Sequence, residues 1–280
     1  MEIRRAATVP EFMGMAGEFL GAREAEHNLI FGICSTIEAD PSQFEAAPYL
    51  AAVVDGDRVV GAAIRTPPWR VVLSLMDHPA AVDQLAEDLA GASLPGALGP
   101  ADSTGAFARA WAERAGVPAR LVRHERSFRL EHVRTPRPVP GSMARAQPAD
   151  KALLSTWARA FIDEALPGGP PQDYDRMADR WIKGLGRTAY LWLDEGRPVS
   201  LTGVGGLTPN GIRVGPVYTP PELRGRGYAS NLVAQVSQLQ LDGGRTFVFL
   251  FTDLANPTPN RIYQAIGYEP VNDIDEYDFT

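Results

Sequence analysis

The first half of the chain alternates between helix-like and strand-like spacing of its apolar residues. Apolar positions three and four residues apart predict helices, and shorter apolar runs bounded by turn residues predict strands. Asp55-Gly56-Asp57 separates two such runs and predicts a hairpin turn. The predicted order is helix 9–19, helix 28–37, strand 49–54, strand 59–65, strand 69–75, helix 79–89, helix 104–115 and strands within 120–132.

The second half repeats this order of elements. Asp194-Glu195-Gly196-Arg197 predicts its hairpin turn, and 247–251 is apolar throughout, as in a strand buried on both faces. Gly267 stands where a left-handed residue would end the last helix. The predicted order is helix 149–165, helix 172–183, strand 190–193, strand 199–204, strand 212–218, helix 225–241, strand 245–251, helix 257–266 and one or two strands within 268–280.

A proline-rich segment lies at the midpoint. Three prolines fall within 135–141, and this composition favours an extended, poorly packed chain. Because it separates two halves of equal element order, we expect two domains, 1–134 and 143–280, joined by the linker 135–142. The length of 280 residues suits two domains of about 140 residues each.

The composition is that of an ordinary globular protein, with 45% hydrophobic and 22% charged residues. The net charge of −7 argues against a nucleic-acid-binding surface, which needs a basic face. No stretch approaches the roughly 20 apolar residues of a membrane span, and the N-terminus does not have the pattern of a signal peptide. We therefore expect a cytoplasmic protein with no nucleic-acid or membrane partner. The scarcity of lysine beside abundant arginine, alanine, glycine and proline suggests a GC-rich bacterial genome.

The single cysteine, Cys34, excludes an intrachain disulfide and a thiolate metal cluster. Its apolar neighbours Phe31, Gly32 and Ile33 predict a small buried core residue rather than a reactive thiol. No metal site is expected.

The loop between the strand ending at Tyr218 and the next helix contains Arg224-Gly225-Arg226-Gly227-Tyr228-Ala229. Two glycines and an alanine let a ligand approach the backbone, and the amides of 225–229 would point along the start of the helix. Free N–H groups and the positive end of a helix dipole suit a pyrophosphate. Arg224 and Arg226 add positive charge. The loop is not a P-loop, because no Gly-Lys-Ser/Thr follows, and it lacks the dinucleotide-binding fingerprint.

The helix after the loop is amphipathic. Tyr228, Leu232, Val236 and Leu239 recur at helical spacing and predict its buried face. Packing of that face would hold the first turn of the helix in place.

A second set of residues follows the apolar strand, within 256–268, and with the loop it resembles the two signatures of the GNAT superfamily of N-acetyltransferases. The signature Gln/Arg-x-x-Gly-x-Gly/Ala is matched by Arg224, Gly227 and Ala229. The second signature has an asparagine, a tyrosine seven residues later, a glycine and an aromatic, matched by Asn256, Tyr263, Gly267 and Tyr268. The resemblance covers about residues 143–280. It implies an α/β (α+β) fold of two tandem GNAT-like domains, each a mixed, mostly antiparallel twisted sheet flanked by helices.

The resemblance also implies direct transfer of an acetyl group from acetyl-CoA, the acyl-donor cosubstrate, to a primary amine of a small molecule or peptide. In the family, the strand before the loop carries a bulge and splays from the next strand. A free backbone amide there, of Val217 or Tyr218 in this chain, bonds the thioester carbonyl. Tyr263 matches the tyrosine that protonates the departing thiolate; its alternative is an aromatic core residue. The implied coenzyme A contacts are Val217, Tyr218, Arg224, Gly225, Arg226, Gly227, Tyr228, Ala229, Ser230, Asn256, Asn260 and Tyr263.

The group that deprotonates the attacking amine is left open. All four histidines lie in the first half, so the second half offers carboxylates. Asp253 ends the buried strand where the reaction centre is expected, but it could equally cap the following turn. Glu222, Asp163 and Glu164 are further candidates, and an ordered water could serve instead.

The corresponding junction of the first half is Met76-Asp77-His78-Pro79, with no glycine. Asp77 would place a negative charge where a pyrophosphate must sit, and Pro79 removes an amide donor. His78 is interpreted as a cap or surface residue. We therefore expect a degenerate first domain that shapes the acceptor cleft, and one acetyl-CoA per chain, in the second domain.

Two functions stay open at this point. One is the N-acetyltransferase, and the other is a non-catalytic acyl-CoA-binding module that senses metabolites or holds a partner. Tyr263 favours the enzyme, because a sensor needs the loop and not the proton donor. The acceptor, the acyl chain and the oligomeric state, a homodimer included, are left open.

Overall fold

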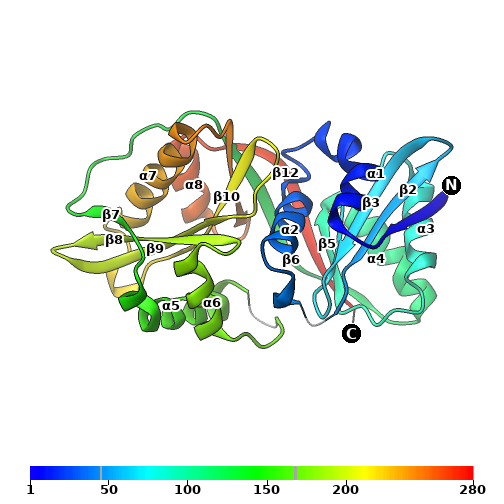
Figure 1. Cartoon of the computed structure of the whole chain (residues 1–280), viewed down its shortest axis with the longest axis horizontal. Coiled ribbons are helices and arrows are strands. Elements are labelled where there is room, and N and C mark those ends of the chain that lie inside the picture. Colours follow the sequence, from blue (N-terminus) through cyan, green and yellow to red (C-terminus); the bar gives the residue numbers. More distant parts are fainter. Residues whose placement is uncertain (45, 167–168, 280) are drawn as a thin grey trace. The chain divides into compact units, whose positions relative to one another are not determined.

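In the computed structural model, which describes residues 1–44, 46–166 and 169–279, the chain divides into two units (Figure 1). Unit 1 consists of Met1–Ser127, Thr252–Ala255 and Val271–Thr280, and unit 2 of Phe128–Phe251 and Asn256–Pro270. The chain thus leaves unit 1, builds unit 2 and returns to unit 1 near its end. The domain boundaries expected from the sequence stay a prediction.

Unit 1 is built on a mixed sheet. Strands β1 to β4 pair antiparallel in sequence order, β4 and β5 are parallel, and β5 and β12 are antiparallel. The spatial order is β1 (Glu2–Ala6), β2 (Tyr49–Asp55), β3 (Arg58–Arg65), β4 (Val71–Leu73), β5 (Gly96–Pro100), β12 (Glu269–Phe279) and β6 (Ala119–Leu130). Its helices are α1 (Val9–Gly21), α2 (Asn28–Ala39), α3 (Pro79–Asp88) and α4 (Ala101–Ala115), with a 3₁₀ turn η1 at Pro41–Gln43.

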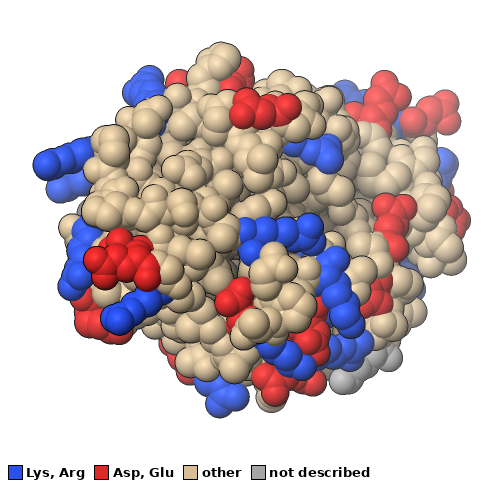
Figure 2. All heavy atoms as spheres, turned by 60° about the vertical axis from the view of Figure 1, so that its left-hand side comes forward, with Lys and Arg blue, Asp and Glu red and all other residues tan. Residues whose placement is uncertain are grey.

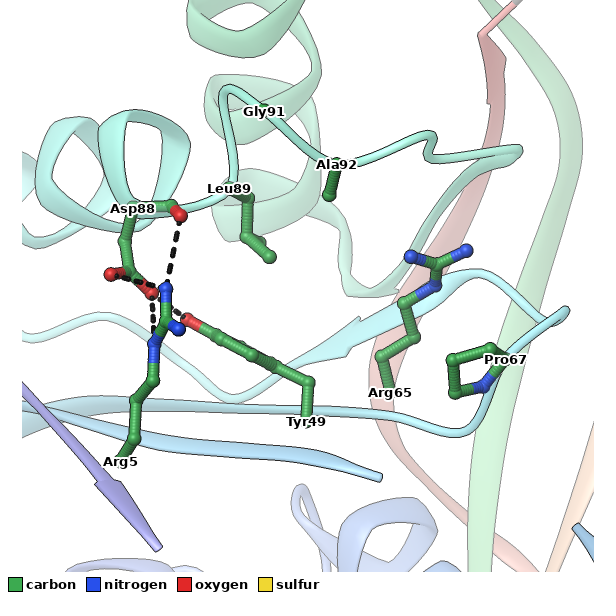
Figure 3. A pocket seen from close by; sticks show the side chains of 8 residues that line it. All are labelled: Arg5, Tyr49, Arg65, Pro67, Asp88, Leu89, Gly91 and Ala92. Atoms are coloured by element: carbon green, nitrogen blue, oxygen red, sulfur yellow. Dashed lines mark hydrogen bonds and ion pairs between the residues drawn. The ribbon is translucent and has the colours of Figure 1, made fainter. Parts of the chain in front are cut away.

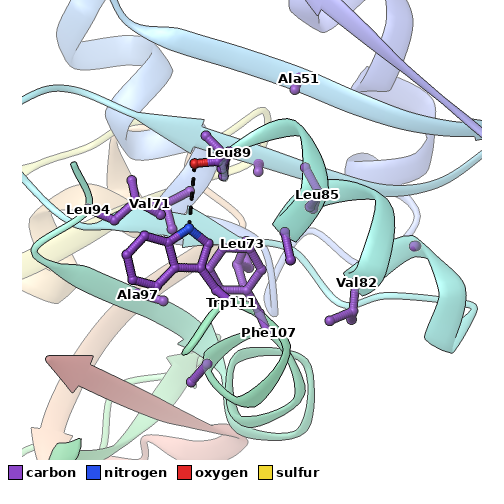
Figure 4. Packing of buried hydrophobic residues seen from close by; sticks show 14 of the residues in the cluster. Ala51, Val71, Leu73, Val82, Leu85, Leu89, Leu94, Ala97, Phe107 and Trp111 are labelled. Carbon is purple, nitrogen blue, oxygen red and sulfur yellow. Dashed lines mark hydrogen bonds between the residues drawn. The ribbon is translucent and has the colours of Figure 1, made fainter. Parts of the chain in front are cut away.

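Helices cover both faces of this sheet, because the strands are apolar on both sides. On one face, α3 and α4 pack through Leu85, Phe107 and Trp111, and the indole N–H of Trp111 donates to the Leu89 carbonyl at 3.5 Å (Figure 4). On the other face, α1 and α2 form a second core. That core contains Cys34, whose thiol has its pKa raised to about 12 by burial, so the predicted inert core cysteine is confirmed.

Strand β12 is strongly acidic for a strand that lies between two others. Its carboxylates are matched by basic residues of unit 1: Glu276 bonds Arg70 at 2.9 Å and Arg123 at 2.7 Å, and Asp273 bonds Arg126 at 2.5 Å. The side chains of Arg123 and Glu276 are only 12% and 9% exposed. A buried charge without its partner is costly, so this pairing fixes which strands β12 can lie between.

Unit 2 has a second mixed sheet, with antiparallel pairing from β7 to β10 and parallel pairing of β10 with β11. The spatial order is β11 (Phe247–Asp253), β10 (Gly211–Tyr218), β9 (Arg197–Gly205), β8 (Arg187–Asp194) and β7 (Ser142–Arg145). Helices α5 (Lys151–Ala165) and α6 (Tyr174–Lys183) cover one face, and α7 (Tyr228–Asp242) and α8 (Pro257–Ile266) the other. Two 3₁₀ turns, η2 (Pro148–Asp150) and η3 (Pro221–Leu223), precede α5 and α7. The predicted fold class, tandem mixed sheets flanked by helices, is confirmed.

The proline-rich segment is extended, with no helix or strand over 133–139, and most of its residues are exposed as expected, but a few contacts tie it to unit 2. Val139 packs against the core of unit 2, the Pro140 carbonyl accepts from the Trp192 indole at 2.8 Å, and the Arg137 carbonyl accepts from the Asn231 amide at 3.0 Å. An extended chain outside a ladder keeps its carbonyls available, and buried donors of unit 2 use them.

Helix α7 differs from the prediction at one position. Leu232 and Val236 are fully buried, as is Val233, but Leu239 is 41% exposed. The buried arc is centred on the middle of the helix, and Leu239 lies in its last turn at the edge of that arc.

The face of the molecule shown in Figure 2 does not gather charge of one sign. On the face shown in Figure 2, acidic and basic side chains intermix across the described atoms, as the modest net charge of −7 allows. Among the described residues, every helix is too short or too polar to cross a membrane.

Truncation of Leu85 to alanine should destabilise unit 1 by about 2–5 kcal/mol, because the side chain is fully buried in the α3–α4 core and leaves a cavity. Urea unfolding followed by tryptophan fluorescence measures this. Leu121→Ala is the matched control, because Leu121 is 48% exposed, and it should change stability by less than about 0.5 kcal/mol. Equal losses in both variants would contradict the assigned core.

Candidate active site

The bulge expected in the strand before the loop is present in β10. Val214 lies opposite Val204 and Val217 opposite Thr202, so β10 has one more residue than β9 between these pairs. Gly215 supplies the unusual backbone conformation, with a φ of 140°. The Thr202 hydroxyl donates to the Pro216 carbonyl at 3.0 Å and holds the bulge to β9.

The expected splay of β10 from its other neighbour is also present. The parallel register with β11 covers only Gly211–Arg213, opposite Phe247–Phe249. Along 214–218, the backbone groups of β10 that point toward β11 have no ladder partner on that strand. An amide N–H in this stretch is therefore available to a ligand carbonyl. Val217 is half-buried and Tyr218 is buried against Trp157 of α5, with the two rings 6.0 Å apart.

The N-terminus of α7 is open. Gly227 is its N-cap with a φ of 85°, and no side chain caps the helix. The first helical hydrogen bond runs from the backbone N–H of Asn231 to the Gly227 carbonyl at 3.1 Å. The amides of Tyr228, Ala229 and Ser230 precede that bond and have no acceptor in the helix. Gly225 is also left-handed, with a φ of 76° and open space where a Cβ would lie. These backbone donors form an anion cradle of the kind that suits a pyrophosphate.

The two arginines of the loop differ in their partners. Arg224 donates to the Thr219 carbonyl at 2.8 Å and to the Glu164 carboxylate at 2.7 Å, so its charge is compensated and it ties the loop to α5. Arg226 is exposed and donates to the Glu222 carbonyl at 3.1 Å. Arg226 therefore keeps a net positive charge beside the open helix start.

Tyr228 contributes its backbone N–H to the open helix start, and its side chain points into the core instead. Its ring is buried in the core of unit 2, and its hydroxyl donates to the Asp194 carboxylate at 2.5 Å. This contact anchors the first turn of α7 to the β8–β9 hairpin. Sequence reasoning took Asp194 for a turn residue, and nothing in the local pattern signals its contact with a helix 34 residues away.

Tyr263 projects from α8 into the α7–α8 core and is 9% exposed, with its ring edge-on to Tyr268 at 6.0 Å. The Tyr268 hydroxyl bonds Ser237 at 2.8 Å, whereas the Tyr263 hydroxyl has no hydrogen-bond partner among the described residues. Burial raises the pKa of the Tyr263 hydroxyl, which keeps it protonated at neutral pH. It is therefore a neutral donor with no competing protein acceptor in the described structure.

Comparisons with known proteins show what this chain is similar to. The model of the FR47-like protein family matches residues 203–277, which include the bulge, the open helix start and Tyr263. Solved structures match over nearly the whole chain. An acetyltransferase of the GNAT family from Colwellia psychrerythraea has a TM-score of 0.62 at 11% identity, covering 100% of both chains. The chain has the GNAT fold.

Two further structures also match over nearly the whole chain. A tandem GNAT protein from the clavulanic acid biosynthesis pathway has a TM-score of 0.59 at 16% identity, covering 99% of this chain and 97% of its own. A Drosophila protein has a TM-score of 0.72 at 13% identity, covering 99% and 98%. No curated protein sequence matches the chain. The GNAT resemblance seen in the sequence is therefore confirmed for the fold, including its tandem layout.

The remaining predicted contacts lie at the start of α8. The Asn260 side chain donates to the Asn256 carbonyl at 2.8 Å and so braces the first turn of the helix. Gly267 ends the helix with a φ of 112°, as expected for a left-handed terminator.

The candidate bases are largely engaged elsewhere. The Asp253 carboxylate accepts from the Ala255 amide at 2.7 Å, which is the turn-capping alternative, and Asp253 belongs to unit 1. Glu164 holds Arg224, as described above. Asp163 and Glu222 are exposed. The structure thus singles out no carboxylate of unit 2 as the base.

The matching junction in unit 1 is closed. His78 is the N-cap of α3, and its ring Nδ1 accepts from the Ala80 amide at 3.1 Å, so its expected role as a cap is confirmed. Pro79 occupies the first turn, and Asp77 is bonded by Arg23 and by Arg58 at 2.7 Å. A side-chain cap and a carboxylate leave no cradle for a phosphate here.

Unit 1 also has a shallow pocket of about 290 Å³, remote in sequence from every GNAT signature (Figure 3). Arg5 and Tyr49 both bond Asp88 in its wall, at 2.8 Å and 2.5 Å. Because Arg5 and Asp88 compensate each other's charge, we interpret these polar residues in the pocket wall as a structural ion pair.

Substitution of Gly225 by valine should lower acetyl-CoA affinity at least ~10-fold, because a branched side chain would fill the approach to the open helix start. Isothermal titration calorimetry measures this. Gly196→Val is a matched control: Gly196 has a φ of 75° and open space around its Cβ position, so the backbone strain is the same. Equal affinity in the two variants would refute the cradle.

The chain should bind one acetyl-CoA. Only the α7 junction of the two compared here is open, whereas His78 and Asp77 close the α3 junction. Calorimetric titration of the full chain should give a stoichiometry near one, and a value near two would show that unit 1 is a second binding site.

Proposed function

We propose that this GNAT chain is an acetyl-CoA-dependent N-acetyltransferase that acts on the primary amine of a small molecule or peptide. The observation that carries the proposal is the bulge in β10, where the strand has left β11, directly ahead of the uncapped start of α7. One strand–loop–helix unit thus offers a donor for a thioester carbonyl and a cradle for a pyrophosphate.

The residues divide the chemistry as follows. The amides at the start of α7 and Arg226 bind the pyrophosphate of acetyl-CoA. A backbone amide of Val217 or Tyr218 bonds the thioester carbonyl and stabilises the negative charge that develops on its oxygen. The amine nitrogen forms a bond to the carbonyl carbon, the carbon–sulfur bond breaks, and the amine proton leaves to water.

Tyr263 serves the leaving group. The sulfur gains the electron pair of the broken bond. The neutral phenol donates its proton to the resulting thiolate, which gives the free CoA thiol, and the phenolate regains a proton from solvent. Burial raises the pKa of this phenol, so Tyr263 is neutral at physiological pH, and the absence of a described partner leaves the hydroxyl available. The same residue weighs against the second candidate, a non-catalytic acyl-CoA-binding module, which would need the cradle alone.

The first experiment is a panel of primary amines incubated with acetyl-CoA and the full chain, with release of the free CoA thiol as readout. Amine-dependent thiol release supports the transferase. Tight acetyl-CoA binding without release on any amine would favour the binding module.

Replacing Tyr263 by phenylalanine should lower kcat on the order of 10²-fold while acetyl-CoA affinity stays close to that of the wild type, because only the proton donor is lost. Tyr268→Phe is the matched control, since it removes a second buried hydroxyl of the same aromatic pair. Pre-steady-state thiol release measures the chemical step. Unchanged turnover in Tyr263→Phe would remove this hydroxyl from the mechanism.

A further inference from the structure

A half-buried arginine lies on the same stretch of sheet as the bulge. Arg187 opens β8, and its side chain lies over Gly203 of β9. A Cβ at Gly203 would come within 2.6 Å of Arg187 Cδ, so the glycine makes room for the side chain. The guanidinium donates to the carbonyl of Gly215, inside the bulge of β10. Arg187 therefore spans a neighbouring strand to reach the point where β10 leaves the sheet.

A second arginine faces the same position. Gly205 of β9 pairs with Arg187 on one side and with Arg213 of β10 on the other. Arg213 lies over the ring of Phe251 at 5.5 Å. Burial, and then the charge of Arg213, lower the pKa of Arg187 to about 9. Two like charges are thus held together on one stretch of the sheet.

Arg187 has no carboxylate within ion-pair distance among the described residues, and its hydrogen bond is to a neutral carbonyl. This sets it apart from the loop cation Arg224, which has Glu164, and from Arg70 and Arg123 of unit 1, which share Glu276. A half-buried guanidinium has lost part of its hydration, and an anion would compensate that loss. A guanidinium has five N–H donors in a planar fork, so one bond to Gly215 leaves donors for a bidentate partner.

The place of Arg187 specifies that partner. Gly215 stands two residues before Val217, roughly 7 Å along an extended strand. The coenzyme phosphates have their own cradle of amides ten and more residues further along the chain. We infer that Arg187, with Arg213 beside it, binds a carboxylate of the acceptor, so the acceptor is an amine of the amino-acid class. The inference rests on the proposed acetyl transfer and names its substrate class.

The test compares acceptors that differ only in this charge. The twenty common amino acids and their carboxamides are assayed with acetyl-CoA by thiol release, in the wild type and in Arg187→Met, which keeps the length of the side chain and removes its charge. The wild type should prefer at least one acid over its amide by ~10²-fold or more in kcat/KM. Arg187→Met should abolish that preference through KM, with acetyl-CoA affinity unchanged. Arg197→Met, on the exposed β8–β9 turn, is the control and should behave as wild type.

A binding measurement separates this inference from the proposed function. N-acetyl amino acids and their amides are titrated calorimetrically into the protein–CoA complex, and Arg187→Lys serves if Arg187→Met does not fold. Carboxylate-dependent binding that Arg187 substitutions remove supports the inference even without turnover. Turnover of amides or simple amines as fast as acids would overturn it while leaving the acetyltransferase intact. Weaker acetyl-CoA binding in Arg187→Met, or no carboxylate-dependent binding or turnover, would also overturn it.

Discussion

The register shift of β10 between Val214 and Val217 is the constraint on which the candidate site depends. A strand in the interior of a sheet is normally satisfied on both sides, and its backbone is then closed to ligands. Here β10 stays bonded to β9, partly through the hydroxyl of Thr202, while β11 pairs with only the first three residues of β10. The strand therefore presents polar backbone groups in a place that the rest of the sheet keeps rigid.

The elements around this shift each supply one kind of interaction. The loop and the start of α7 offer backbone donors, Tyr263 offers a neutral hydroxyl, and Arg187 offers an uncompensated cation. The supporting contacts come from residues distant in the sequence: Asp194 bonds Tyr228, Glu164 bonds Arg224, and Gly203 admits Arg187. Preorganised donors of this type stabilise developing charge without having to move.

Much of this could be predicted from the sequence, where the pattern is local. The residues 224–229 predicted the open helix start, and the sequence pattern predicted α8 with its observed bounds. Strand β5 was missed because Gly96–Pro100 lacks the β-branched and aromatic residues that mark strands. The exposure of Leu239 depends on where the buried arc of α7 lies, which spacing alone does not fix.

The position of Arg187 was beyond the sequence for a different reason. Its role depends on the lateral register of three strands and on two glycines, Gly203 and Gly205, that lie on the strand between the arginines. Single-sequence patterns report which residues form a strand, and they say little about which residues of neighbouring strands lie opposite one another.

The acidic strand β12 has a consequence for how the protein is made. Its partners β5 and β6 emerge from the ribosome more than a hundred residues before residues 271–279 do, and all of unit 2 is synthesised in between. Until the strand arrives, Arg70 and Arg123 lack their counter-charge and the sheet of unit 1 has an unfilled position. Such long-range pairing is slow and exposes strand edges to wrong partners. Unit 1 is therefore the first part of the chain to be translated and the last to be completed.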